Sequence, residues 1–278
     1  MLIVYLCNQL GNQMFQYALY RKLLYLGKDV KLDVRHFRKY LEHYRLDNIF
    51  DLNLSIATTK EIKYIQGYIA RLKRKIFGEC SPIFNEVNTD TMIFKKEVFQ
   101  YENMYLYGFW QSEKYFSDIR NILLSEFNFP EINDDKNMDI LKKIQQHISV
   151  SIHVRRGDYV TSIFPTMTKD YYQRAMDYFF KKYSNVFFVV FSDDISWAKK
   201  YISFKNGIFV NWNNGKESYK DMQLMSLCNH NIIANSSFSW WGAWLNRNED
   251  KEIIAPSKWF YHRKTPDIYC PGWIIIDI

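Results

Sequence analysis

One histidine, two arginines and one aspartate occur within six residues near the middle of the chain. His153, Arg155, Arg156 and Asp158 follow the β-branched run 148–152, which is typical of a buried strand. In an open α/β sheet, ligands bind in the crevice outside the carboxyl ends of the strands. This loop therefore predicts an anion-binding site, although a solvated surface loop with an internal Arg–Asp pair would give the same pattern.

Polar residues also follow two later apolar runs that are predicted to be strands. They are Asp193 and Asp194 after one run, and Asn235, Ser236 and Ser237 after the other. Parallel strands bring their carboxyl ends to one edge of a sheet, so we expect the three polar segments to meet there. Each of these residues alone could simply cap the helix that follows it. The convergence of three segments favours a site for a nucleotide diphosphate.

The predicted site supplies donors for phosphate and an acceptor for a base. The helix that begins near residue 238 would direct N–H groups and its positive dipole end at a phosphate. Arg155 would add a charge-assisted fork, and Asp193 or Asp194 would accept hydrogen bonds from a guanine edge. The sequence has no Asp-x-Asp metal signature. We therefore expect arginine, helix dipole and N–H groups, and no metal, to stabilise a leaving diphosphate.

Strand and helix patterns alternate regularly between residues 139 and 255, which predicts a parallel sheet with helices on both faces. The chain begins with a similar unit, in which a strand at 2–7 and a turn lead to a helix that starts at Gln13. That turn should open onto the crevice of its own sheet. There Asn12 and Gln13 would either cap the helix or contact a ligand.

A polar, proline-marked stretch at 130–136 is the best linker candidate in the chain of 278 residues. We therefore predict two α/β domains, 1–135 and 136–278, a division that fits the length of ordinary domains.

Composition limits the partners. A net charge of +7 suits an anionic ligand or membrane surface, but the charges are too dispersed to predict nucleic-acid binding. The four cysteines are far apart and indicate neither a disulfide framework nor a zinc site, so a reducing cytosol is expected. The apolar run 2–7 is too short for a signal peptide, and no window approaches the roughly 18 apolar residues of a membrane-spanning helix.

Two segments of the first half could contact larger partners. The polar and aromatic stretch 35–51 is of the kind that holds substrates. The pattern at 60–77 predicts a basic amphipathic helix, which either packs on its own domain or lies on an anionic membrane surface.

Four motifs together resemble glycosyltransferase family 11, the α-1,2-fucosyltransferases. They are GNQMFQYA at 11–18, HVRRGDY at 153–159, FSDD at 191–194 and NSSFSWWGAWL at 235–245. The resemblance implies a GT-B-like fold with two facing Rossmann-type domains, an N-terminal one for the acceptor and a C-terminal one for a GDP-sugar. It also implies a bacterial cytoplasmic enzyme. Leu10 stands where the family usually has a second glycine before the first motif.

The resemblance further implies metal-independent transfer of L-fucose from GDP-β-L-fucose, with inversion, to the 2-hydroxyl of a terminal galactose. The acceptor would be an oligosaccharide or lipid-linked glycan of a surface polysaccharide or O-antigen. Arg155 would contact the donor pyrophosphate, His153 would support the same loop, and Asn12 would face the reacting sugar.

The base that accepts the hydroxyl proton is less closely determined. Asp158 is one candidate, and it could instead pair with Arg155 or Arg156 and hold the loop. The remaining candidates are His36, Glu42 and His43, which lie in the first half, and His153 of the same loop. A carbohydrate-binding protein without activity, or a phosphate-ester hydrolase or kinase, would be the alternatives to a transferase.

Overall fold

The computed structural model describes residues 1–278 except 40–44, 68–71, 73–81, 89–91 and 162–163. The chain forms two compact units. Unit 1 comprises Met1–Asn128 with Lys264–Ile268, and unit 2 comprises Phe129–Arg263 with Tyr269–Ile278. The division falls seven residues before the predicted boundary between 135 and 136.

The segment Lys264–Ile268 was expected in the second domain but packs in unit 1. Its backbone and side-chain atoms form hydrogen bonds with other residues of unit 1. Met92 N donates to Lys264 O at 3.2 Å, Phe94 N donates to Asp267 Oδ2 at 2.7 Å, and Lys114 pairs with the same carboxylate. These long-range bonds cannot be seen in local sequence patterns.

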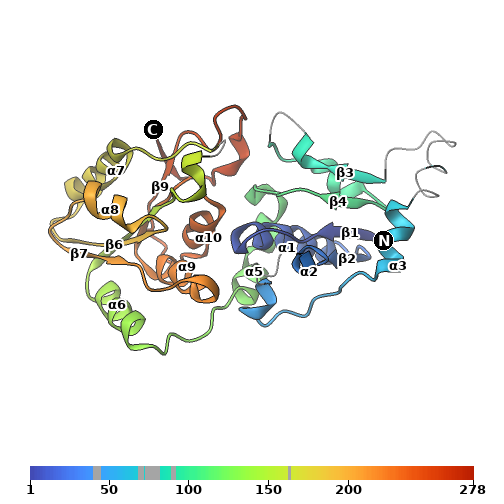
Figure 1. Ribbon diagram of the computed structural model, residues 1–278, viewed down its shortest axis with the longest axis horizontal. Helices are drawn as coiled ribbons and strands as arrows, with labels where there is room; N and C mark the ends of the chain where they lie inside the picture. The colour runs from blue at the N-terminus through green and yellow to red at the C-terminus, as the bar shows by residue number, and fades with distance from the viewer. Residues whose placement is uncertain (40–44, 68–71, 73–81, 89–91, 162–163) are drawn as a thin grey trace. The chain divides into compact units, whose positions relative to one another are not determined.

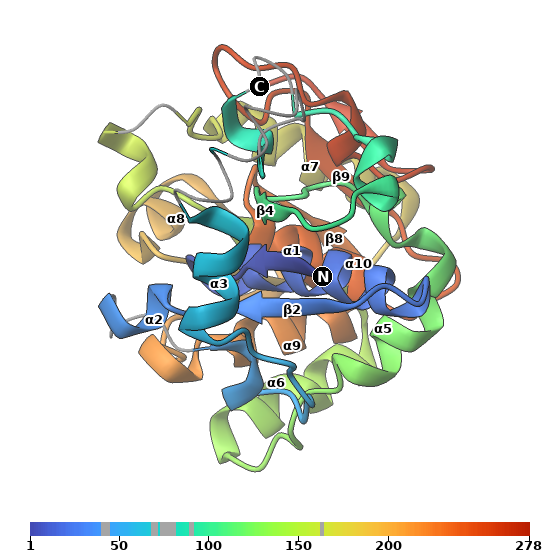
Figure 2. The ribbon, with the colours of Figure 1, turned by 90° about the vertical axis from the view of Figure 1, so that its right-hand side faces the viewer.

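Unit 1 is built on a four-stranded sheet in the order β2-β1-β4-β3, and every neighbouring pair is parallel. Its strands are β1 (Leu2–Tyr5), β2 (Val30–Asp33), β3 (Ile83–Asn85) and β4 (Tyr105–Tyr107), and its helices are α1 (Leu10–Tyr25), α2 (His36–Lys39), α3 (Thr59–Gln66) and α5 (Arg120–Glu126). Figure 2 looks onto this unit, with β2 in front of α1. Ile62 and Ile65 of α3 pack on Ile3 and Tyr105, so α3 covers one sheet face. In the described part of the helix predicted at 60–77, α3 ends at Gln66 and Gly67 is extended; the remaining residues, apart from residue 72, lie outside the described part of the chain.

The helix α1 begins at Leu10, three residues earlier than predicted. Asn8 takes φ = +65°, so the chain turns before residue 10, and Gly11 and Asn12 lie within the first turn of the helix. Asparagine is one of the few non-glycine residues that adopt this left-handed conformation readily.

Unit 2 carries a six-stranded parallel sheet in the order β10-β9-β8-β5-β6-β7. Its strands are β5 (Ile148–Val154), β6 (Val186–Ser192), β7 (Gly207–Val210), β8 (His230–Ile232), β9 (Ile253–Pro256) and β10 (Ile274–Ile276), and its helices are α6 (Asp135–Gln146), α7 (Lys169–Lys182), α8 (Ile195–Tyr201), α9 (Tyr219–Leu227) and α10 (Ser237–Leu245). The predicted alternation is confirmed, and β10 is an additional strand that the sequence pattern did not reveal.

Helices cover both faces of this sheet. Side chains alternate along β6, so that Val186, Phe188 and Val190 pack with α7 and α8, whereas Phe187, Val189 and Phe191 pack with α6 and α9. Figure 1 shows α7 and α8 on one side of the sheet and α6 on the other. Burial on both faces explains why β6 consists almost entirely of apolar residues.

Each sheet has one place where the strand order reverses. In unit 2 the chain proceeds from β5 outward to β7 and then returns to form β8 on the other side of β5. In unit 1 the reversal lies between β1 and β4. Ligands of open α/β sheets bind at such points, outside the carboxyl ends of the two strands. The loops after β5 and β8, and those after β1 and β4, are therefore the segments where a site is expected.

Candidate active site

The loop after β5 presents Arg155 between two carboxylates. Its Nη2 lies 2.6 Å from Asp158 Oδ1, and its Nη1 lies 2.9 Å from Asp193 Oδ2. The guanidinium also lies over the ring of Tyr159, with its carbon 5.2 Å from the centroid. Arg155 retains 26% side-chain exposure. Arg155 is therefore fixed by its neighbours and still accessible to a ligand, at the point where the strand order of the sheet reverses.

Asp193 fixes the backbone of this loop. Its two oxygens accept hydrogen bonds from Arg156 N at 2.8 Å and Gly157 N at 3.1 Å. A Cβ atom at position 157 would lie 2.8 Å from Asp193 Oδ2, so the close approach requires glycine. The sequence had suggested that Asp193 accepts bonds from a guanine edge. In the structure both oxygens bond to the loop after β5, and the contact of Asp193 or Asp194 with a guanine edge stays a prediction.

Asp194 and Arg156 are likewise occupied within the protein. Asp194 Oδ1 accepts a bond from Trp197 N at 3.0 Å and caps α8, while its Oδ2 lies 3.4 Å from Arg156 Nε. The Arg156 guanidinium stacks over the Trp197 ring at 4.4 Å. The sequence left open whether Asp194 caps a helix and whether Arg156 pairs with a carboxylate, and the structure contains both contacts.

The loop after β8 lies beside the loop after β5. Tyr159 Oη donates to Asn235 O at 3.3 Å and joins the two segments. Asn235 Nδ2 donates to Pro165 O and Trp259 O, whereas Asn235 Oδ1 is buried without a hydrogen-bond partner among the residues that the structure describes. Such an atom carries a desolvation cost that a bound donor could relieve.

The start of α10 completes this edge of unit 2. Ser236 caps the helix and accepts a bond from Phe238 N at 3.3 Å, and the partly exposed Ser237 is its first residue. The helix is anchored by the buried rings of Trp240, Trp241 and Trp244. The positive N-terminal end of α10 follows β8, and Arg155 follows β5. Both therefore lie at the point where the strand order reverses, as predicted.

His153 lies near the end of β5 and is 7% exposed. Burial and the nearby Arg155 charge lower the pKa of its imidazole to about 3, so the ring is neutral at physiological pH. Its Nδ1 is buried and has no hydrogen-bond partner in the described part of the chain, and its ring lies 5.6 Å from that of Phe238. His153 O accepts a bond from Tyr172 Oη at 3.0 Å, which ties the end of β5 to α7.

In unit 1 the corresponding residues follow β1 and β4. Gln111 Nε2 donates to Asn12 Oδ1 at 2.9 Å, which links the two loops at that reversal point. Gln13 is fully buried, and its amide bonds to Asn8 O and Leu46 N, both at 2.8 Å. The expected ligand contact by Gln13 therefore does not fit the structure, in which this side chain holds two loops together.

Glu86 supports the turn that carries Gln111. One carboxylate oxygen accepts bonds from Phe109 N and Trp110 N, each at 2.8 Å. Burial raises the pKa of this carboxyl. Sequence inspection missed Glu86 because it lies in a segment without clear periodicity, and Gln111 because its importance depends on contact with Asn12. The position of Gln111 directly after a predicted strand was the only signal available.

Among the residues that the structure describes, no group of three or more His, Cys, Asp and Glu side chains could hold a metal ion. Within the same residues, no helix has both the length and the apolar character needed to cross a membrane.

Comparison with known proteins identifies the family. The model of "Glycosyl transferase family 11" matches residues 1–277. The chain is 36% identical to an α-1,2-colitosyltransferase of Escherichia coli, over 98% of this chain and 97% of that protein. It is 32% identical to the O-antigen biosynthesis glycosyltransferase WbnK of Escherichia coli, over 97% of this chain and 98% of that protein.

A solved structure resembles the chain in fold. NodZ α-1,6-fucosyltransferase, soaked with GDP-fucose, superimposes with a TM-score of 0.50 over 88% of this chain and 91% of its own, at 14% identity. The predicted GT-B-like α/β fold class is thereby confirmed. The whole-chain match also favours a transferase over the non-enzymatic, hydrolase and kinase alternatives. The chain belongs to glycosyl transferase family 11.

Proposed function

We propose that the protein transfers L-fucose from GDP-β-L-fucose to the 2-hydroxyl of a terminal galactose, with inversion at the sugar carbon. The whole-chain match to family 11 carries this proposal. The loops of unit 2 support it, because Arg155 and the start of α10 lie at the edge where an open sheet binds a nucleotide diphosphate.

In the proposed reaction the galactose O2 forms a bond to the fucose anomeric carbon from the face opposite GDP. The bond from that carbon to the diphosphate oxygen breaks, and GDP leaves with the electron pair. Arg155 and the N–H groups at the start of α10 stabilise the charge that develops on the diphosphate, without a metal ion. Asn12 remains a predicted contact of the reacting sugar.

Asp158 is the proposed acceptor of the hydroxyl proton. Its side chain is 67% exposed and bonds to Arg155, so both roles considered from the sequence remain compatible with the geometry.

Colitose is the second donor sugar to consider, because a 36% identical relative is an α-1,2-colitosyltransferase. Colitose lacks the 3-hydroxyl of fucose, so the two GDP-sugars differ by one hydrogen-bonding group. Product formation should be measured with GDP-fucose, GDP-colitose and GDP-mannose on galactose-terminated oligosaccharides, with the linkage determined by NMR. An α-1,2-fucosylated product supports the proposal. Transfer of colitose alone would assign the donor to the second candidate, and transfer of neither would contradict both.

We place this activity in the cytoplasm, in the synthesis of O-antigen or another surface polysaccharide on an oligosaccharide or lipid-linked acceptor. Peripheral contact with an anionic membrane belongs to the same proposal. Co-sedimentation with liposomes should then require acidic lipid and decrease with salt. Equal recovery with neutral and acidic liposomes would contradict the membrane contact.

A further inference from the structure

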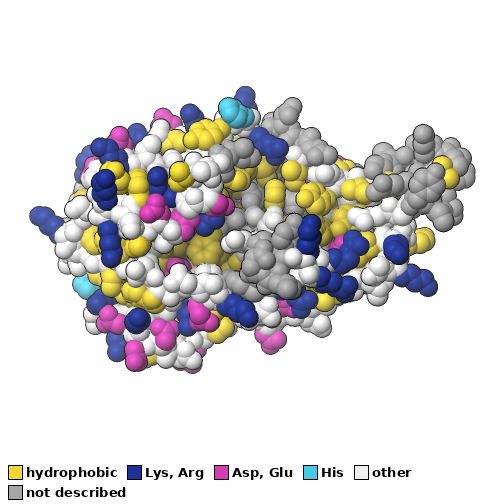
Figure 3. Space-filling model, viewed as in Figure 1, with side chains coloured by type: hydrophobic (Ala, Val, Ile, Leu, Met, Phe, Trp, Pro, Cys, Tyr) yellow, Lys and Arg dark blue, Asp and Glu magenta, His cyan; other side chains and the backbone are white. Residues whose placement is uncertain are grey.

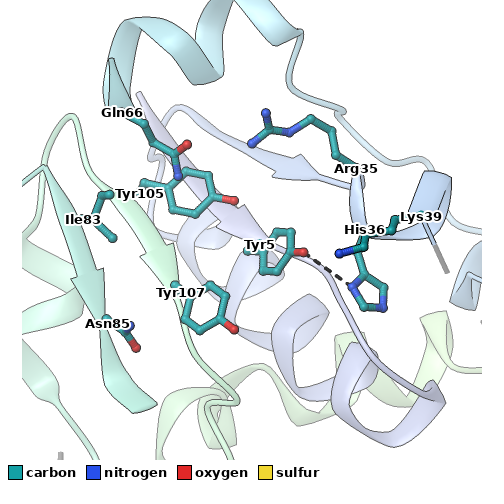
Figure 4. Close-up of a pocket in the computed structure, with 9 residues that line it drawn as sticks. All are labelled: Tyr5, Arg35, His36, Lys39, Gln66, Ile83, Asn85, Tyr105 and Tyr107. Carbon is teal, nitrogen blue, oxygen red and sulfur yellow. Dashed lines mark hydrogen bonds between the residues drawn. The ribbon is translucent and has the colours of Figure 1, made fainter. Parts of the chain in front are cut away.

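The turn after β4 meets the loop after β1 at the reversal point of unit 1, and this turn contains a strained residue. Figure 4 shows the last residues of the two strands, Tyr5 and Tyr107, side by side, with their ring centroids 5.4 Å apart. Further along the turn, Trp110 is fully buried and takes φ = +57°, a left-handed conformation that is uncommon for a bulky residue. Strain of this kind persists only where the surroundings enforce it, and it clusters at functional sites.

A buried carboxylate, that of Glu86, holds the strained turn. It accepts hydrogen bonds from Phe109 N and Trp110 N, each at 2.8 Å. A Cβ atom at position 108 would lie 2.8 Å from Glu86 Cβ, so Gly108 permits the close approach. A different conformation of the turn would have to break two hydrogen bonds to this carboxylate.

A buried glutamine ties the same turn to the loop after β1. Gln16 Nε2 donates to Gly108 O at 3.0 Å, and Gln16 Oε1 accepts a bond from Cys7 N at 2.8 Å. The side chain that the turn presents next, that of Gln111, is therefore fixed relative to the start of α1.

Gln111 uses one half of its amide to bind Asn12. Its Nε2 donates to Asn12 Oδ1 at 2.9 Å, whereas its Oε1 is buried and has no hydrogen-bond partner among the described residues. With both amides turned over, the buried atom without a partner would be an NH₂ group. Buried N–H groups without partners are rarer than such carbonyl oxygens, which favours Gln111 as the donor and Asn12 Oδ1 as the acceptor.

This bond decides which atom of Asn12 is presented outward. The side chain is partly exposed, and its Nδ2 has no hydrogen-bond partner in the described part of the chain. Ligands of an open sheet bind at the reversal point, so Nδ2 is a donor available to a ligand there. The Lys and Arg side chains that Figure 3 shows on unit 1 gather over α2 and α3, and the Gln111–Asn12 pair is uncharged. An uncharged donor suits a hydroxyl or ring oxygen of a sugar.

We propose that Gln111 is a positioning residue, which holds Asn12 Oδ1 so that Asn12 Nδ2 donates a hydrogen bond to an oxygen of the reacting sugar. The inference deepens the proposed function, on which it rests for the identity of the ligand as that sugar. Gln111 acts only through Asn12. Replacing Gln111 should therefore matter only while Asn12 is present.

A double-mutant cycle measures this dependence. Gln111→Ala should lower kcat/KM for sugar transfer about tenfold in the wild-type background, the effect of one hydrogen bond, and by less than about twofold in the Asn12→Ala background. The matched control is Ser112→Ala, because Ser112 belongs to the same turn and its Oγ accepts a bond from Lys114 N. This control should change kcat/KM equally in both backgrounds. Equal losses from Gln111→Ala in both backgrounds, or no loss in the wild type, would overturn the proposal.

Two substitutions of similar shape test the direction of the bond. Gln111→Glu cannot donate to Asn12 Oδ1, so the Asn12 amide would turn its Nδ2 inward, and the loss should be at least that of Gln111→Ala. Asn12→Asp keeps an acceptor for Gln111 but removes the outward donor, so kcat/KM should fall about tenfold or more while the melting temperature is retained. Wild-type rates in either variant would overturn the assignment of Nδ2 as the donor.

The positioning role and the proposed function can fail separately. No transfer by the wild-type chain in the donor assay would contradict the proposed function. The positioning is then measured by NMR of a chain labelled with ¹⁵N in its Asn and Gln side chains, in which Asn12→Ala identifies the Asn12 signal. Gln111→Ala should lower the heteronuclear NOE of Asn12 Nδ2, because the amide becomes mobile, and Ser112→Ala should not. An unchanged value in Gln111→Ala would overturn the positioning role.

Discussion

Mild acid should destabilise unit 2 through His153. Burial and the Arg155 charge lower the pKa of this imidazole to about 3, whereas its ordinary value is 6.5. The unfolded chain therefore binds more protons than the folded chain between these two values. The stability contributed by the neutral ring is fully present above pH 6.5 and is lost as the pH decreases toward 3.

The expected size of the effect follows from this shift. A pH of 5 lies 1.5 units below the ordinary pKa of 6.5, so the imidazole is protonated in the unfolded chain. In the folded chain the imidazole remains neutral at this pH. At about 1.4 kcal/mol per unit, the loss in unfolding free energy between pH 7 and pH 5 is about 2 kcal/mol. His153→Phe retains an aromatic ring beside Phe238 and cannot titrate. Between pH 7 and pH 5 the unfolding free energy of this variant should therefore decrease by about 2 kcal/mol less than that of the wild type.

Urea unfolding at the two pH values tests the argument. Seven of the eight tryptophans lie in unit 2, so their fluorescence reports on the unit that contains His153. The matched control is His262→Phe, because His262 is exposed in the same unit and its replacement should preserve the wild-type pH dependence. A parallel loss of stability in wild type and His153→Phe would refute the buried neutral histidine.

Three further predictions concern the proposed chemistry. Arg155→Lys keeps the charge but loses the planar fork, so turnover should fall roughly tenfold or more while the melting temperature is retained; wild-type rates would make Arg155 purely structural. Chelation by EDTA should leave transfer largely intact, and a loss restored by Mn²⁺ or Mg²⁺ would contradict the proposed stabilisation of the diphosphate. Asp158→Asn should reduce turnover sharply with GDP affinity and melting temperature near wild type. If turnover, GDP affinity and melting temperature decrease together, Asp158 is a loop anchor. Normal turnover would exclude both the role of base and that of anchor.

Much of the fold of unit 2 follows from local pattern. Apolar runs such as 186–191 lie between polar strand ends and capped helices, and Thr168 caps α7 as predicted. Unit 1 was harder to predict, because β3 and β4 have three residues each and the turn before α1 depends on the left-handed conformation of Asn8. Three-residue strands give too few alternations for a periodic signal.

The predicted convergence of polar strand ends correctly located the loops of unit 2, but it did not distinguish ligand contacts from internal bonds. Asp193, Asp194 and Arg156 have the residue types of a binding site. In the structure, however, Asp193 accepts bonds from backbone N–H groups of the loop after β5, and Asp194 accepts a bond from Arg156 of that loop. Which oxygen faces which N–H depends on the tertiary approach of β5 and β6. That approach is not encoded in the spacing of the residues.

The return of Lys264–Ile268 to unit 1 has a consequence for biosynthesis. This segment emerges only after residues 129–263 have been synthesised, so unit 1 cannot acquire its last bonds, including that from Phe94 N to Asp267, while it is the only part made. The usual order, in which an N-terminal domain completes folding before the next one, does not apply here. Chimaeras that exchange unit 2 between relatives should therefore keep residues 264–268 from the parent that supplies unit 1.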